Sequence, residues 1–152
     1  MARVQDYVRL HKQAEATLPS LKPKEAQPEA IAAHQQALAK KIREARANAK
    51  ARDIFTPASQ PAFRRAVRNV FAAPQGSHVR ATLAEGAPLV RVRLNVNDVY
   101  PDGTPQTTVP PTLLRELPKL PDEVEYRIVG RDLLLLDVRA NLVVDVLRDL
   151  LP

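Results

Sequence analysis

The stretch YRIVGRDLLLLDVRANLVVDV, residues 126–146, decides the fold because it alternates short apolar runs with turn-forming residues. Tyr126 and Ile128 alternate in the manner of a strand, and Gly130 with Arg131 suits a tight connection. Residues 133–138 form an apolar run, which is typical of a buried central strand. Asn141 adopts positive φ at modest cost, so it suits the next turn, before 142–146 returns. The stretch therefore predicts three antiparallel strands in chain order.

Upstream of this stretch, LVRVRLNVN at 89–97 also alternates apolar and polar residues. Its period of two predicts another strand, buried on one face and solvated on the other. Pro110 and Pro111 then introduce a short helix over 112–117, and the tail 147–152 is expected to add a last helical turn.

Residues before 89 have a period near 3.6 instead, which predicts helices. The expected helices cover 3–18, 28–51 and 60–73, with a short fourth from Ser77 to Gly86, and the first two form an antiparallel hairpin. Ser59 is a candidate N-cap, and Ile54 with Phe55 should plug into the core. The fold class is therefore α+β, with three to four N-terminal helices followed by a small antiparallel sheet of three to four strands.

Composition limits what this chain of 152 residues can be. It has 45% apolar residues, enough for a core, and no cysteine, which excludes disulfides, thiolate metal sites and a cysteine nucleophile. The apolar runs are too short to span a bilayer, and the first residues lack the apolar region of a signal peptide. The protein is therefore expected to be cytosolic, or to be an exported protein whose numbering starts after its leader.

Charge divides the chain into two regions that are expected to form one folded unit, a helical basic region at 1–88 and a strand-rich, Pro-punctuated, acidic region at 89–152. Residues 1–94 hold 17 Lys and Arg against 7 Asp and Glu, whereas residues 95–152 hold 6 against 10. Opposite charges on two regions favour docking to a protein partner or self-association.

The C-terminal module, from Tyr126-Arg-Ile-Val-Gly-Arg-Asp-Leu through Leu136-Asp-Val to Val143-Val-Asp-Val, resembles the β-hairpin of RcnB-type periplasmic nickel/cobalt-homeostasis proteins. The resemblance covers about 25 residues and implies a small exported bacterial protein, with a periplasmic location. His11, His34 and His78 all lie outside this module, so the resemblance implies no metal site.

Catalytic and metal-binding patterns are not found in the sequence. The three histidines are far apart along the chain, whereas metal ligands usually come in local pairs. Asp132 and Asp137 are an odd number of residues apart, so they fall on opposite faces of a regular strand and do not form a carboxylate pair. Turn capping and surface solubility account for these and for Asp145 and Asp149. We therefore expect no enzyme, no cofactor and no metal.

The candidate interaction residues are basic and lie on the helices expected at 28–51 and 60–73. They are Lys40, Lys41, Arg43, Arg46, Arg64, Arg65 and Arg68. The favoured interpretation is a non-catalytic accessory protein that docks these residues on a protein partner or on another copy. The alternative is a nucleic-acid-associated protein that binds the phosphate backbone through 28–51 and 60–73, although no stacking aromatic residues are interleaved.

Overall fold

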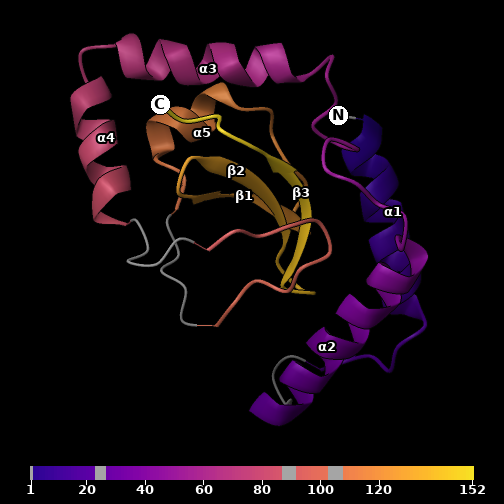
Figure 1. The fold of residues 1–152 in the computed structure, drawn as a ribbon. Coiled ribbons are helices and arrows are strands. Elements are labelled where there is room, and N and C mark those ends of the chain that lie inside the picture. Colours follow the sequence, from indigo (N-terminus) through magenta and orange to yellow (C-terminus); the bar gives the residue numbers. More distant parts are fainter. Residues whose placement is uncertain (1, 23–26, 87–91, 103–107) are drawn as a thin grey trace.

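The fold combines helices and a small sheet, as the sequence predicts, and Figure 1 shows the helices arranged around the sheet. The structure is a computed structural model and describes residues 2–22, 27–86, 92–102 and 108–152. In these ranges the helices are α1 (Ala2–Ala16), α2 (Pro28–Ala45), α3 (Gln60–Ala72), α4 (Gly76–Glu85) and α5 (Pro111–Glu116). The strands are β1 (Val124–Val129), β2 (Asp132–Asp137) and β3 (Leu142–Leu147).

The three strands form an antiparallel meander in which β2 is central. Both turns depend on positive φ, with Gly130 at 61° and Asn141 at 50°. A left-handed conformation costs little at glycine and is tolerated by asparagine. The prediction for residues 126–146 is thus confirmed.

A β-bulge at Val144 changes which side chains of β3 face the helices. Leu135 pairs with Asp145 and Leu136 with Val143, so one residue of β3 is skipped. An extra residue in one strand reverses the alternation beyond it. The helix-facing residues of β3 are Leu142, the bulged Val144 and, beyond the bulge, Leu147.

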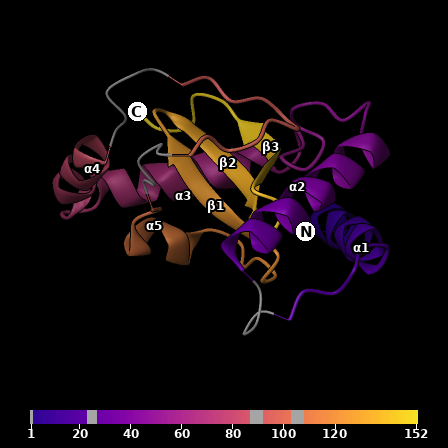
Figure 2. The same ribbon diagram turned by 90° about the horizontal axis from the view of Figure 1, so that it is seen from below.

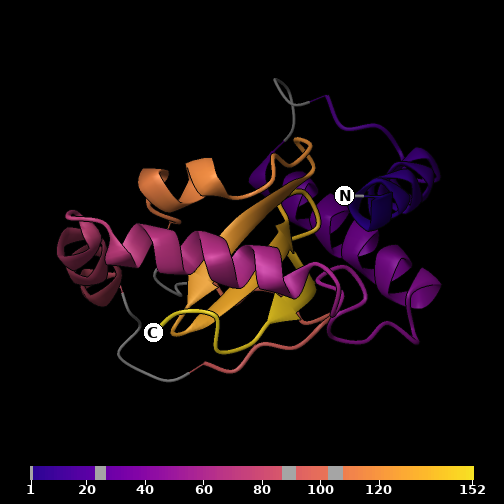
Figure 3. The same cartoon turned by 90° about the horizontal axis from the view of Figure 1, so that it is seen from above.

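The sheet is buried on both faces. On one face, Tyr126, Leu135 and their neighbours join the apolar sides of α1, α2, α3 and α5 in the main core, and Figure 3 shows α3 running across the sheet. On the other face, Leu94 and Tyr100 cover Leu134 and the apolar residues around it.

The helices contact one another in two groups. α1 packs against α2, and α3 contacts both α4 and α5; Figures 1 and 2 show the first pair at one side of the sheet and α4 at the other. Ile54 and Phe55, in the connection between α2 and α3, enter the core as predicted, with Phe55 buried. The ring of Phe63 on α3 lies edge-on to those of Phe55 and Tyr126, with centroids 5.2 and 6.2 Å apart.

The strand predicted for 89–97 is wrong over 92–97, and 89–91 lie outside the described residues. Asn97 has φ of 69°, and the Asp98 carboxylate accepts the Asn95 N–H at 2.7 Å, so the chain turns here. It contacts the edge of β3 through a few bonds, such as Asn97 N–H to Val143 O at 2.8 Å. Leu94 lies over the sheet face, which produces the same alternation as a strand.

Several predicted helix boundaries also differ from the structure. α2 ends at Ala45 instead of 51, because Arg46 leaves the helical conformation. Ser59 stands at the N-cap position of α3, as predicted, but its side chain makes no capping bond; its hydroxyl donates to the Thr56 carbonyl at 3.0 Å. Ser77 lies inside the first turn of α4, which begins at Gly76, and the tail after β3 forms a turn rather than a helix.

Candidate functional site

Four arginines line one groove between α3, α4 and the tail that follows β3. Arg64 and Arg68 come from α3, Arg80 from α4 and Arg131 from the β1–β2 turn, and all four are exposed. The groove has a volume of about 520 Å³. Two of the four, Arg64 and Arg68, belong to the predicted interaction residues, and Arg65 on the same helix does not line the groove.

Apolar side chains form the floor between these guanidinium groups, among them Val67, Phe71, Leu150 and Leu151. The tail is held in place because the backbone N–H groups of Leu150 and Leu151 donate to the Arg131 carbonyl at 2.9 and 3.0 Å. The Nε–H of Arg131 donates in return to the Leu151 carbonyl at 2.9 Å. The groove therefore has a fixed apolar base and a cationic rim.

Three of the four arginines, Arg64, Arg80 and Arg131, use backbone carbonyls or an aromatic ring as internal partners. Arg64 Nη1 donates to the Asp149 carbonyl at 3.2 Å, and the Arg80 guanidinium lies 5.0 Å from the centroid of the Phe71 ring. Within the ranges that the structure describes, none of the four forms an ion pair with a carboxylate. Asp149, which also lines the groove, is the one acidic residue there.

The structure does not bring the other predicted residues to this groove. Lys40 and Arg43 are exposed on α2, with Lys41 half-buried, and no residue of α2 lines the groove. Arg46 is half-buried: its guanidinium lies 5.0 Å from the centroid of the Tyr7 ring and donates to the Val144 carbonyl at 3.0 Å. Burial lowers the pKa of Arg46. This arginine therefore ties α2 to α1 and β3.

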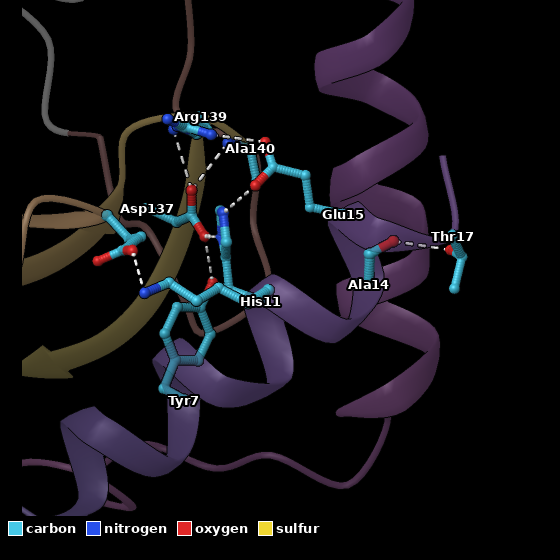
Figure 4. A network of polar contacts seen from close by, with 10 residues as sticks. Tyr7, His11, Ala14, Glu15, Thr17, Asp137, Arg139 and Ala140 are labelled. Carbon is cyan, nitrogen blue, oxygen red and sulfur yellow. Dashed lines mark hydrogen bonds and ion pairs between the residues drawn. The ribbon is translucent and has the colours of Figure 1, made fainter. Parts of the chain in front are cut away.

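A second cluster of charged groups lies buried between α1 and the end of β2 (Figure 4). His11 and Asp137 are both fully buried, and His11 Nδ1 lies 2.5 Å from Asp137 Oδ2. Tyr7 donates its hydroxyl to the same oxygen at 2.7 Å. Because a carboxylate only accepts hydrogen bonds, His11 donates through Nδ1. The other oxygen, Oδ1, accepts the backbone N–H groups of Arg139 and Ala140 at 3.0 and 2.8 Å.

The outer side of this cluster is closed by an ion pair. His11 Nε2 lies 3.6 Å from Glu15 Oε2, and Arg139 donates to Glu15 Oε1 at 2.7 Å. Burial raises the pKa of Tyr7, and the charge and hydrogen bond of Asp137 add to this, so the phenol stays a neutral donor. The sequence pattern that marks this cluster is Tyr7 and His11 four residues apart on the apolar face of α1.

Asp145 is a third buried charge, and it holds the connection between α2 and α3. Its Oδ2 accepts the backbone N–H groups of Ile54 and Phe55, both at 2.7 Å. Its Oδ1 accepts those of Arg52 at 2.8 Å and Val146 at 2.7 Å. The prediction that Asp137 and Asp145 serve surface solubility is wrong, since both are fully buried. They do cap turns and loops.

No group of three His, Asp or Glu side chains suited to a metal ion occurs in the described parts of the chain. In the same parts, no helix has both the length and the apolar character to cross a membrane. No family of known proteins matches the chain, and neither does any curated protein or any solved structure.

Proposed function

We propose that this is a non-catalytic accessory protein that binds an acidic segment of a protein partner in the groove between α3 and α4. The observation that carries the proposal is the set of four exposed arginines around an apolar floor, none of them ion-paired within the described chain. Guanidinium groups bind carboxylates through paired hydrogen bonds, and an apolar floor adds contact area. An acidic peptide with interspersed apolar side chains fits both features. We also propose that the protein acts outside the bacterial cytoplasm, which is what the resemblance of its last strands implies.

A different protein is favoured over a second copy of this chain because half of the acidic residues of the C-terminal region are buried or ion-paired within the fold. Asp137 and Asp145 are buried, Asp132 pairs with Arg148, and Glu123 pairs with Lys12 at 3.0 Å. The exposed carboxylates that remain in this region, those of Asp102, Glu116, Asp122 and Asp149, are spread along the chain instead of forming one acidic segment that could fill the groove of another copy. Self-association through complementary charge is the second outcome that the test below distinguishes.

Nucleic acid is the weaker candidate for two reasons that the arrangement of basic residues supports. The groove takes its arginines from α3, α4 and the β1–β2 turn and none from α2, so the basic residues of α2 and α3 offer no continuous track for a phosphate backbone. Single-stranded nucleic acids also need aromatic faces for stacking. The one aromatic residue that lines the groove, Phe71, has Arg80 over its ring.

The test uses a fluorescent peptide of alternating Glu and Leu, a Lys-and-Leu peptide of the same length, and a single-stranded oligonucleotide, with anisotropy as the readout. Arg64→Glu with Arg68→Glu should weaken binding of the acidic peptide. Each reversal removes one attraction and adds one repulsion, and each of these effects is worth about 0.2–1 kcal/mol. The double variant therefore loses at least about fourfold in affinity.

The matched control is Arg65→Glu, which changes the charge of α3 by as much as either single reversal, Arg64→Glu or Arg68→Glu, but outside the groove. It should leave the affinity within about twofold of wild type, because only long-range charge changes and salt screens it. Equal loss from the control would show a general polyanion effect and refute the groove. Tighter binding of the oligonucleotide than of the peptide would favour the nucleic-acid alternative, and concentration-dependent mass in light scattering would favour self-association.

A further inference from the structure

The contact between α1 and the sheet is made by titratable groups that have no part in the arginine groove. We propose that Tyr7, His11 and Asp137 form a pH-dependent latch, which keeps α1 docked on the sheet while His11 is protonated and loosens it when His11 loses its proton. The cluster joins residues 126 and 130 positions apart in sequence, and both hydrogen bonds end on one carboxylate oxygen.

Every charged group that faces His11 has a defined place. From α1 come Tyr7, below it, and Glu15, beside Nε2; from the end of β2 and the following turn come Asp137 and Arg139. Lys12 forms an ion pair with Glu123 at 3.0 Å, and the guanidinium of Arg46, the residue after α2, lies 5.0 Å from the centroid of the Tyr7 ring. His11 thus sits between two carboxylates, those of Asp137 and Glu15.

The protonated imidazole suits this position and the neutral one does not. With both nitrogens protonated, Nδ1–H donates to Asp137 and Nε2–H points to Glu15, 3.6 Å away. The neutral ring can keep the first bond, but it then turns the lone pair of Nε2 toward a carboxylate and removes the positive charge beside Asp137. Nε2 has no hydrogen-bond partner among the described residues, so nothing else there would satisfy that lone pair.

The direction of the pH effect follows from the balance of forces on His11. Burial lowers the pKa of His11, and Arg139 opposes the proton as well, but the hydrogen bond and charge of Asp137 with the charge of Glu15 outweigh them and raise it above its ordinary value. A raised pKa in the folded state stabilises the docked form fully below about pH 6.5, and this stabilisation is lost as the pH rises through the folded pKa.

The experiment is hydrogen exchange read by mass spectrometry on the wild-type protein from pH 5.5 to 9, corrected for intrinsic exchange. Peptides covering α1 are compared with peptides covering α3, and the imidazole of His11 is titrated by NMR with His78 as an exposed reference. We expect the opening equilibrium of α1 to rise by up to about tenfold per pH unit between about pH 6.5 and the pKa of His11, then level off. The opening of α3 should not follow it.

Two variants separate the latch from a general loss of stability. His11→Gln keeps an amide donor for Asp137 but cannot titrate, so the exchange of α1 should lose its pH dependence. Glu15→Gln leaves His11 in place and removes one charge that favours its proton, so the transition should move to lower pH even if His11→Gln does not fold. Equal pH dependence in α1 and α3, no pH dependence in α1, or an unchanged transition in Glu15→Gln would each overturn the proposal.

Discussion

Replacing Asp145 by Asn is the sharpest test of how the helical part is fastened to the sheet. Each carboxylate oxygen of Asp145 accepts two backbone N–H groups, at 2.7–2.8 Å. An asparagine has the same shape but only one oxygen, so either orientation of its amide turns an NH2 group toward two N–H donors. Two buried hydrogen bonds are lost, and two donors are left without an acceptor.

The expected cost is large compared with the stability of a domain of this size. A hydrogen bond to a charged group contributes about 1.5–3 kcal/mol, so losing two should lower the free energy of unfolding by about 3–6 kcal/mol. Whole domains have about 5–15 kcal/mol. At about 2–4 °C per kcal/mol, Tm should fall by roughly 6–24 °C.

Urea unfolding followed by far-ultraviolet circular dichroism measures this change, and Asp149→Asn is the matched control. Asp149 is exposed and has φ of 48°, a conformation that asparagine tolerates, so the control should stay within about 0.5 kcal/mol of wild type. A loss below about 1 kcal/mol for Asp145→Asn, or an equal loss for both variants, would refute the assignment of Asp145 as the anchor of the connection between α2 and α3.

Two further substitutions test the packing of α3. Gly76→Ala would press its Cβ against the Phe71 carbonyl oxygen, a backbone atom that cannot move away, so we expect a loss of about 1–3 kcal/mol in urea unfolding. Wild-type stability would mean that the corner between α3 and α4 adapts easily. Phe63→Ala removes the ring that lies between Phe55 and Tyr126 and should cost about 3–5 kcal/mol, whereas Phe63→Leu should cost clearly less. Equal losses for these two variants would show that volume in this part of the core matters little.

The sheet and most helices could be predicted because their signals are local. Gly130 and Asn141 indicate turns by their own backbone preferences. The four consecutive leucines at 133–136 indicate a buried strand by their composition. The false strand at 92–97 shows the limit of periodicity. A chain that lies over a sheet face buries alternate residues just as a strand does, and only Asn97 and Asp98 reveal the turn.

The polar anchors could not be predicted because their partners lie far away in sequence. Arg46 comes after a basic helix face, so the sequence indicates a solvated residue. In the structure its guanidinium instead lies over the Tyr7 ring and donates to the Val144 carbonyl at the bulge. Asp137 ends a strand, where a surface position is usual, but the side of α1 that faces the sheet supplies Tyr7 and His11 as its partners. Arg80 and Arg131 joined the groove through tertiary packing that no local pattern encodes.

The position of these anchors along the chain has a consequence for how the protein is made. Translation at about 5–20 residues per second separates the synthesis of His11 from that of Asp137 by roughly 6–25 s, since 126 positions lie between them. Asp145, which accepts the Arg52 N–H, is likewise synthesised 93 positions after Arg52. During that interval the apolar sides of the nascent α1 and α2 have no sheet to cover them, so we expect the emerging N-terminal part to be a client of ribosome-associated chaperones until the meander has been synthesised.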